Sequence, residues 1–183
     1  MPSVFLSPST QEFNPYVIGG NEEQYMNLIA DAMVPYLLAS GIEVGRNNPD
    51  EPLSAAIAAS NAGSYDLHLA LHSNAAPPSL EGQLQGTDVY YYANSLRGQD
   101  AATIIANNFR WIYPDPDLVH IVPNTTLAEL RRVTAPSVLI EVAYHDNVAD
   151  AEWIRDNVQA IAYNLSISVT DFLGVPFTEP VWG

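Results

Sequence analysis

The chain has 183 residues, of which 48% are hydrophobic, and this is enough apolar material for one well-buried core. Six Lys and Arg residues stand against 21 Asp and Glu residues, so the formal net charge is −15. A basic surface for phosphate backbones or anionic lipid headgroups is therefore missing, and we expect neither a nucleic-acid nor a membrane partner. The lack of cysteine excludes disulfides, Cys-ligated zinc, iron–sulfur clusters and thiol catalysis.

The length predicts a single domain over residues 1–183, with a core over 4–173 and a short tail over 174–183. Residues 1–6 contain neither a basic leader nor a long apolar run. We therefore expect no signal peptide and no membrane span, and a protein that is made without export. We also expect a monomer.

Short apolar runs bounded by Gly, Pro and polar residues predict strands, and apolar residues at a spacing of 3.6 predict helices. In chain order we expect a strand over 4–6, a helix over 22–40, a strand over 42–44, a helix over 53–62 that stops at Gly63, strands over 66–71 and 89–92, a helix over 96–112, a strand over 137–141, and one long or two short helices over 148–173.

Three segments carry further signals. Asn21 is a candidate N-cap, and Glu22 and Glu23 follow it in the first helical turn, where negative charge is favourable. Residues 75–86 contain two prolines and two glycines and are long for a connection, which favours a functional loop. Residues 119–133 show no clear pattern.

The alternation of strands and helices predicts an α/β fold with three layers, in which a largely parallel, twisted β-sheet is flanked by helices on both faces. In such sheets a ligand binds beyond the carboxyl ends of the strands. Polar clusters follow three of the predicted strands, at residues 7–12, 72–74 and 141–147. The sequence therefore predicts one site where these three clusters meet.

His72 and Glu141 each stand at the end of an apolar strand. Burial there is expected to raise the pKa of Glu141, and a desolvated carboxyl group opposite a histidine is what a metal-assisted general base needs. The alternatives are a hydrogen-bonded histidine at a sheet edge and a carboxylate that caps a helix. His68 lies four strand residues from His72, roughly 13 Å away, so the two cannot share one metal ion. His68 is expected either to support the site from behind its ligands or to be structural.

Four segments together resemble the ordered motifs of a known family. They are residues 23–28, residues 67–75 around His72-Ser73-Asn74-Ala75, residues 86–91, and Leu130-Arg131 with residues 135–141. In order and spacing they are similar to the zinc-dependent N-acetylmuramoyl-L-alanine amidases, from residue 4 to about residue 173. The resemblance implies a Zn²⁺ hydrolase that cuts the amide between the lactyl group of N-acetylmuramic acid and the first L-alanine of the peptidoglycan stem peptide, and that acts on the bacterial cell wall.

The resemblance also implies roles for single residues. Glu23 falls on the carboxylate ligand of the metal, His72 on a histidine ligand, and Glu141 on the catalytic glutamate. Asn74 and Arg131 are expected to contact the substrate. For Glu23 the alternative is simple interaction with the helix dipole, and for Arg131 it is a surface ion pair.

The first motif departs from the family pattern. The family places Asp-Pro-Gly-His-Gly after its first strand, and the histidine is a zinc ligand, whereas this chain has Ser-Pro-Ser-Thr-Gln-Glu over residues 7–12. Gln11 lies nearest the position of that histidine, and its neutral amide oxygen would bind zinc less strongly than imidazole does. Thr10 and Glu12 are the alternatives, and Glu12 would add a negative charge.

Two other functions remain open on the residues alone. An amidase-like module that has lost zinc could bind muropeptides without cutting them, and a zinc peptidase could act on ordinary peptides with the same metal chemistry. The presence of Glu23, His72 and Glu141 together favours hydrolysis, because a pure binding module needs no buried base at a strand end.

Overall fold

A computed structural model describes residues 1–181, so the last two residues of the predicted tail lie outside the described part. The helices and strands, in chain order, are β1 (Ser3–Pro8), α1 (Glu22–Ala39), β2 (Glu43–Arg46), α2 (Leu53–Gly63), β3 (Leu67–Asn74), β4 (Thr87–Tyr92), α3 (Leu96–Phe109), β5 (Val119–Asn124), α4 (Ala128–Arg131), β6 (Ser137–Tyr144), α5 (Val148–Asp156) and α6 (Val158–Leu173). Short 3₁₀ turns occur at Pro78–Leu80 and Pro116–Leu118.

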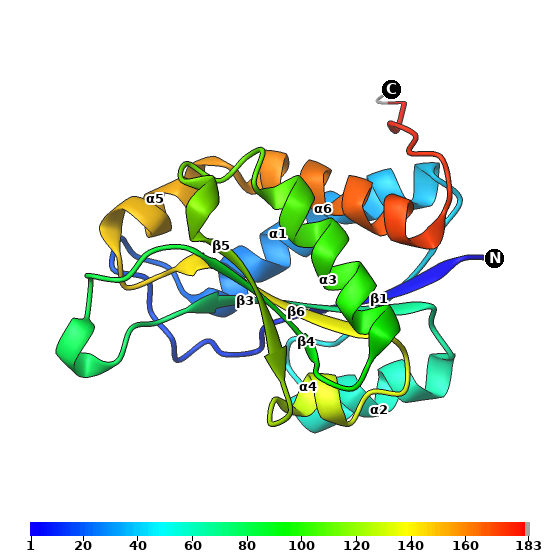
Figure 1. The fold of residues 1–183 in the computed structure, drawn as a ribbon, viewed down its shortest axis with the longest axis horizontal. Coiled ribbons are helices and arrows are strands. Elements are labelled where there is room, and N and C mark those ends of the chain that lie inside the picture. Colours follow the sequence, from blue (N-terminus) through cyan, green and yellow to red (C-terminus); the bar gives the residue numbers. More distant parts are fainter. Residues whose placement is uncertain (182–183) are drawn as a thin grey trace.

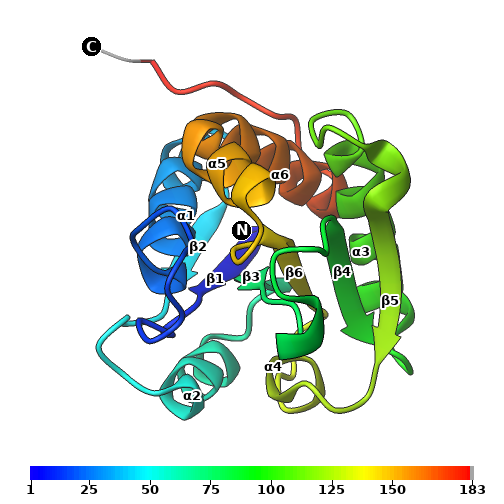
Figure 2. The same ribbon diagram turned by 90° about the vertical axis from the view of Figure 1, so that its left-hand side faces the viewer.

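One six-stranded sheet organises the molecule, with the strand order β2-β1-β3-β6-β4-β5. The first four strands in this order are parallel to one another, while β4 runs antiparallel to β6 and pairs in parallel with β5. The helices α1, α3, α5 and α6 cover one face, and α2 and α4 cover the other (Figures 1 and 2). The predicted three-layer α/β fold with a largely parallel sheet is thus confirmed.

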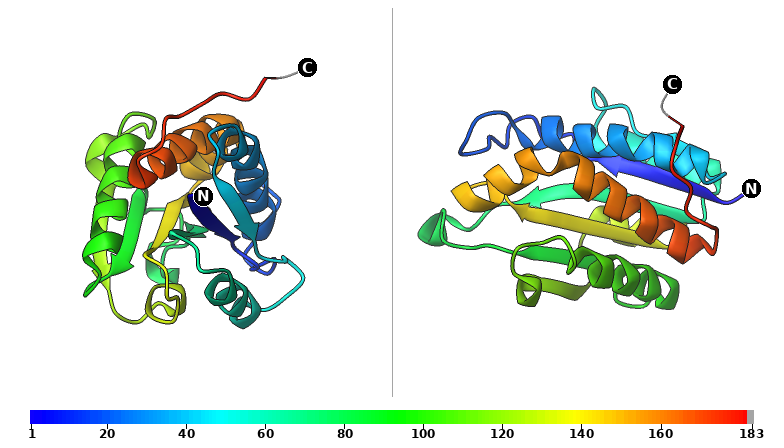
Figure 3. Two further views of the ribbon diagram at one scale, coloured as in Figure 1. Left: turned by 90° about the vertical axis from the view of Figure 1, so that its right-hand side faces the viewer. Right: turned by 90° about the horizontal axis from the view of Figure 1, so that it is seen from above.

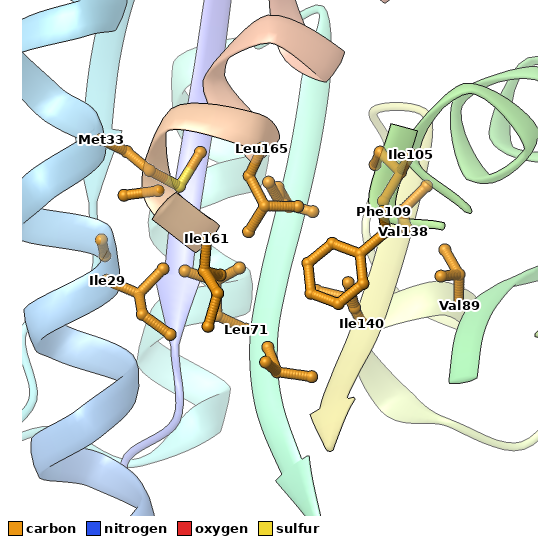
Figure 4. Packing of buried hydrophobic residues seen from close by; sticks show 14 of the residues in the cluster. Ile29, Met33, Leu71, Val89, Ile105, Phe109, Val138, Ile140, Ile161 and Leu165 are labelled. Atoms are coloured by element: carbon orange, nitrogen blue, oxygen red, sulfur yellow. The ribbon is translucent and has the colours of Figure 1, made fainter. Parts of the chain in front are cut away.

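The two faces of the sheet differ in what they bury. Leu67, Leu69 and Leu71 of β3 point into the large core beneath α1, α3 and α6, and these helices lie side by side over the sheet (Figures 3 and 4). The alternate residue Ala70 packs instead into a small cluster with residues of α4 and β6. Because side chains alternate along a strand, His68 and His72 face the thin layer of α2 and α4 together with Ala70.

Both central strands are three residues longer than the sequence predicted. β3 continues through Asn74 and β6 through Tyr144, and the two strands pair up to this last position. Backbone hydrogen bonding between neighbouring parallel strands thus continues after the apolar run has ended. As a result His72 and Glu141 lie within the sheet and not in the loops beyond it.

Three further elements refine the predicted pattern. Helix α2 includes Gly63, and the left-handed residue that ends it is Ser64, with φ of 53°. A side chain at position 63 would collide with the ring of Tyr65, so close packing and not backbone conformation explains this glycine. Residues 119–133, which show no clear sequence pattern, contain β5 and α4. The helical region at the end divides at Asn157 into α5 and α6.

Within residues 1–181, none of the helices combines the length and the apolar character that a membrane crossing requires.

Candidate functional site

The carboxyl ends of β1, β3 and β6 meet at one edge of the sheet. His72 of β3 is the direct neighbour of Glu141 of β6 in the parallel ladder, and both side chains lie on the face covered by α2 and α4. The loop after β1 reaches the same place, because the amide nitrogen of Gln11 lies 3.4 Å from Nδ1 of His72. The structure therefore brings the three predicted polar clusters together.

His72 lies between two buried carboxylates. Its Nδ1 is 2.9 Å from Oε1 of Glu22, and its Nε2 is 3.1 Å from Oε2 of Glu129. Burial alone would lower the pKa of His72, but the hydrogen bonds to Glu129 and Glu22 and the negative charges of Glu129 and Glu141 outweigh it and raise the pKa well above its usual value. Without a bound cation the imidazole therefore holds a proton on each nitrogen and donates one hydrogen bond to each of the two carboxylates.

Glu22 is the carboxylate that the first helix delivers to the site. Asn21 caps α1, since its side chain accepts a hydrogen bond from the backbone nitrogen of Gln24, and Glu22 begins the first turn with only 1% of its surface exposed. The side chain of Asn14 donates to Oε2 of Glu22 over 2.6 Å. Burial would raise the pKa of Glu22, but these partners, with His72 first among them, lower it.

Glu23, the residue expected to bind metal, makes no contact with His72 among the interactions of the described residues. Its side chain is half-buried and lines a separate groove together with Thr10 and Glu12. Of the three alternatives for the first motif, Gln11 alone has a side-chain contact with His72.

Glu129 is a buried carboxylate next to His72 that the sequence did not reveal. Its side chain is 2% exposed and is held from three sides, by His72, by Nε2 of His68 at 3.1 Å and by the hydroxyl of Ser7 at 2.5 Å. Burial would raise the pKa of Glu129, but the hydrogen bonds from the two histidines hold it well below the usual range. His68 also contacts the hydroxyl of Ser60 on α2, so both of its ring nitrogens have partners. One feature of the sequence could have pointed to Glu129. His68 and His72 lie on the same face of one strand, and two buried histidines need a buried hydrogen-bond acceptor.

We expect Glu129→Leu to destabilise the fold by about 3 kcal/mol, because it removes one partner of a buried charged cluster and leaves His68, His72 and Ser7 without their acceptor. Urea denaturation followed by circular dichroism measures this change. Glu12→Leu, at an exposed position, is the matched control and is expected to alter stability by less than about 0.5 kcal/mol. Equal stability of the two variants would contradict a structural role for Glu129.

Glu141 differs from the other carboxylates because it has a free acceptor. Its Oε2 is buried and accepts no hydrogen bond from any residue that the structure describes. Burial raises the pKa of Glu141 to about 7; the charges of Glu22, Asp88 and Glu129 act in the same direction, and His72 opposes them. The direction of this shift is the one expected from the sequence. A carboxyl group that titrates near neutral pH can accept a proton and return it.

The two residues expected to contact substrate, Asn74 and Arg131, lie at different distances from the site. Asn74 ends β3 near the site, but its side-chain oxygen accepts the hydrogen bond of the next backbone nitrogen, at 2.9 Å. Arg131 is exposed and lines a groove beside Ser137, at the amino end of β6. Ser137 pairs with His68, four residues before His72, so roughly 13 Å of strand separates this groove from the site. The structure does not bring Arg131 to His72.

The donor atoms around Nδ1 of His72 fit a zinc ion through two strong ligands and one weak ligand. Glu22 and His72 approach at 2.9 Å, close to the roughly 3.3 Å that separates two ligands of a tetrahedral zinc ion. Glu129 on Nε2 would fix the tautomer that leaves Nδ1 free for metal. Gln11 now accepts from Asn14 through its oxygen, and a turn of its amide would direct that oxygen to the metal. No set of three His, Cys, Asp or Glu side chains suited to a metal occurs in residues 1–181.

Comparisons with known proteins give the family of the chain. The family model described as N-acetylmuramoyl-L-alanine amidase matches residues 13–170. Similar solved structures include the catalytic domain of the amidase CwlV from Bacillus (Paenibacillus) polymyxa, with 18% identity, coverage of 96% of this chain and 100% of that chain, and a TM-score of 0.82. The amidase AmiC2 of Nostoc punctiforme and an N-acetylmuramoyl-L-alanine amidase from Clostridium difficile 630 are each 17% identical, cover 94% of this chain and 97% of theirs, and have TM-scores of 0.81.

A search of curated proteins found no significant match. The family model nevertheless spans most of the chain, and the solved structures share its fold over nearly their whole length. The chain therefore belongs to the N-acetylmuramoyl-L-alanine amidase family.

Proposed function

We propose that this chain is a zinc-dependent N-acetylmuramoyl-L-alanine amidase that hydrolyses the amide between the lactyl group of N-acetylmuramic acid and the first L-alanine of the stem peptide. The observation that carries the proposal is the unpartnered, buried carboxyl oxygen of Glu141 beside His72, in a chain of this family. The substrate is the peptidoglycan of the bacterial cell wall, and the enzyme acts there as a monomer.

Zinc would be held by Glu22, His72 and Gln11, with Glu129 orienting His72 from behind. When bound, zinc supplies a positive charge that polarises the scissile carbonyl and makes a water molecule more acidic. Glu22 takes the role that the sequence suggested for Glu23. The neutral amide of Gln11 leaves the net charge of the ligand set the same as an imidazole would, but it binds the metal less strongly.

Glu141 moves the proton. Its carboxylate accepts a proton at Oε2 from the water whose oxygen attacks the scissile carbonyl carbon. As the carbon–nitrogen bond breaks, Glu141 returns this proton to the nitrogen of L-alanine, and the products are a lactyl carboxylic acid and a free amine. Glu141 lies on β6 directly beside His72 of β3, so its carboxyl group is close to the proposed metal ligand His72.

Removal of zinc is expected to abolish the release of soluble fragments from dye-labelled peptidoglycan, and addition of zinc is expected to restore it. A muropeptide-binding module without catalysis would release nothing in either condition. Mass spectrometry of the fragments identifies the bond, because amidase products carry a new N-terminal alanine, whereas the products of a zinc peptidase do not.

Gln11→His is expected to increase the affinity for zinc by at least about tenfold, because imidazole is the stronger donor at the position nearest His72. Competition with a chelating dye measures this affinity. Glu12→His, in the neighbouring exposed position, is the control and is expected to leave the affinity unchanged. A gain in Glu12→His without a gain in Gln11→His would exclude Gln11 as the third ligand.

The rate of hydrolysis is expected to fall about tenfold per pH unit on the acidic side of the profile, because Glu141 must be ionised to accept a proton. The pKa of Glu141 is about 7 in the metal-free fold, and the positive charge of zinc lowers it, so the acidic limb is expected below pH 7. Asp88→Asn removes a negative charge that faces Glu141 across the β4–β6 pair. This change makes ionisation of Glu141 easier, so the acidic limb of the profile should move to lower pH. If the acidic limb of the Asp88→Asn profile stays in place or moves to higher pH, the pH dependence of the rate does not report the ionisation of Glu141.

A further inference from the structure

Positive charge gathers at one groove of this acidic molecule. The groove lies between the first turn of α3 and the segment that connects α4 with β6, which run side by side in Figure 1. Its volume is about 510 Å³, and Arg97 and Arg131 both line it. Arg132, the residue after Arg131, is exposed as well. The chain has six Lys and Arg residues in all, so half of them lie in this groove or next to it.

The arginines at the groove differ from the other three because their charges have no partner. Arg46 forms an ion pair with Asp31 at 2.8 Å, and Arg155 forms one with Asp156 at 2.7 Å. The guanidinium group of Arg110 donates hydrogen bonds to two oxygen atoms. Within residues 1–181, the three arginines at the groove form neither an ion pair nor a side-chain hydrogen bond. Because Asp and Glu number 21 in this chain, a group of arginines away from all of them leaves an uncompensated positive charge for a ligand.

The rest of the groove lining offers hydrogen-bond donors and no negative charge. Asn94, Ser95 and Thr134 contribute amide and hydroxyl groups, and none of the lining residues in the described part of the chain is an Asp or a Glu. The guanidinium group of Arg97 lies 4.8 Å from the centre of the ring of Phe172. This contact restricts the side chain without neutralising its charge. The groove therefore favours an anion that accepts several hydrogen bonds.

The shape and charge of the molecule select the kind of anion. Guanidinium groups bind phosphate through parallel N–H bonds, and the hydroxyl and amide groups beside them can donate to the same oxygens. A folded acidic protein would bring a wide surface against a molecule of net charge −15 and would be repelled outside the groove. A narrow, flexible chain can touch the groove alone, because charges more than about 8 Å away are largely screened at physiological ionic strength. The complementary partner is therefore a thin polymer with phosphate groups.

We propose that the groove lined by Arg97 and Arg131 binds the phosphodiester polymers attached to bacterial cell walls. The inference rests on the proposed function, because an enzyme that cuts peptidoglycan meets these polymers on its substrate. Ser137 lines the groove, and Glu141 lies four residues later on the same strand, roughly 13 Å away. A polymer in the groove thus leaves the catalytic site open, and it holds the enzyme on a wall whose negative charge otherwise repels it.

The test measures the binding of dye-labelled poly(glycerol phosphate) to the full chain by fluorescence anisotropy. The double variant Arg97→Gln/Arg131→Gln is expected to bind at least about tenfold more weakly, because two charge-assisted contacts are lost. The matched control is Arg46→Gln/Arg155→Gln, which removes the same charge from two arginines that already have carboxylate partners. It is expected to weaken binding by less than about threefold. Equal losses in the two double variants would show that binding follows net charge alone and would overturn the site.

A second pair of variants leaves all arginines in place. Thr134→Glu adds a carboxylate to the groove lining and is expected to weaken binding of the same polymer at least about tenfold. Ser79→Glu adds the same charge at an exposed position outside the groove and should change binding by less than about twofold. Equal behaviour of these two variants would contradict the proposal.

Two competing polymers decide the class of ligand. Poly-L-glutamate and an oligothymidylate, each matched in charge to the poly(glycerol phosphate), are expected to displace the dye-labelled polymer only at concentrations at least about tenfold higher. Stronger displacement by poly-L-glutamate would assign the groove to an acidic protein segment, and stronger displacement by the oligothymidylate would assign it to nucleic acid. Either result would overturn the proposed ligand.

Failure of the groove and failure of the proposed function give different results. The zinc-loaded wild type is mixed with intact walls and with walls from which hydrofluoric acid has removed the phosphodiester polymers. Sedimentation with intact walls at least about fivefold above that with stripped walls supports the groove, and equal sedimentation overturns it. Release of fragments from stripped walls tests the function alone, because the ligand of the groove is missing there. Release without binding of the polymer keeps the function and rejects the groove, whereas binding without release does the reverse.

Discussion

Replacing Glu141 with glutamine is expected to lower the rate of peptidoglycan hydrolysis by about 10²–10⁴-fold and to leave the zinc content unchanged. Glutamine has nearly the same shape but cannot accept the proton of the attacking water. Glu141 makes no hydrogen bond through Oε2, so no structural contact is lost at that atom. Release of dye from labelled walls measures the rate, and elemental analysis measures the zinc. Undiminished hydrolysis by the variant would remove Glu141 from the mechanism.

Glu141→Gln also has a stability signature, which tests whether the carboxyl group of Glu141 is buried without a partner. The pKa of Glu141 is about 7 in the metal-free fold, against 4.5 for an ordinary glutamate, so ionisation above pH 4.5 costs the folded state up to about 3 kcal/mol. The metal-free wild type should therefore lose stability relative to the variant as pH rises from 4.5 to 7. At pH 4, where Glu141 is protonated, the two should be alike. Urea denaturation of both proteins at pH 4 and pH 7 measures the difference in stability, and the comparison at pH 4 is the control.

The sequence predicted the central pair of the site because two simple rules apply to it. Apolar runs end at His72 and Glu141, and parallel strands carry such ends to one edge of a sheet, where the register places the two residues side by side. The prediction did not depend on where the strands end. Both strands proved three residues longer than expected, and the two side chains still face the same layer.

The sequence could not reveal Glu129, because α4 has only four residues and a helix this short has no periodic pattern. The motif resemblance drew attention instead to Arg131, two positions later. The side chain of Glu129 turns under β3 to His68 and His72, while Arg131 is exposed at the other end of β6. Only the packing of α4 on the sheet separates the roles of these two neighbours.

The directions of β4 and β5 were also beyond the sequence. The residues of a strand do not indicate its direction. Strands β2, β1, β3 and β6 are parallel to one another, whereas β4 and β5 run in the opposite direction and are parallel to each other. The reversal has a consequence for the site. It brings Asp88, near the beginning of β4, opposite Glu141, and this negative charge contributes to the raised pKa of Glu141.

Glu22→Gln is expected to weaken zinc binding by more than about 100-fold, with a matching loss of hydrolysis at low zinc, whereas Glu23→Gln should change both by less than about twofold. Loss of a group that only orients a ligand costs about 10–100-fold in metal affinity, and Glu22 lies on the ligand side of His72. Competition with a chelating dye, at equal protein stability, compares the two variants.

This pair is a stringent test because the two residues are adjacent, carry the same charge and occupy the same helical turn. Any general effect of a missing negative charge near the helix N-terminus would appear in both variants. A difference between the two variants therefore reflects where the two side chains point. Glu22 is buried against His72 and Asn14, whereas Glu23 lines a separate groove. A larger loss of zinc in Glu23→Gln would restore the assignment that the motif alone suggests and would require a turn of the first helix by about 100°.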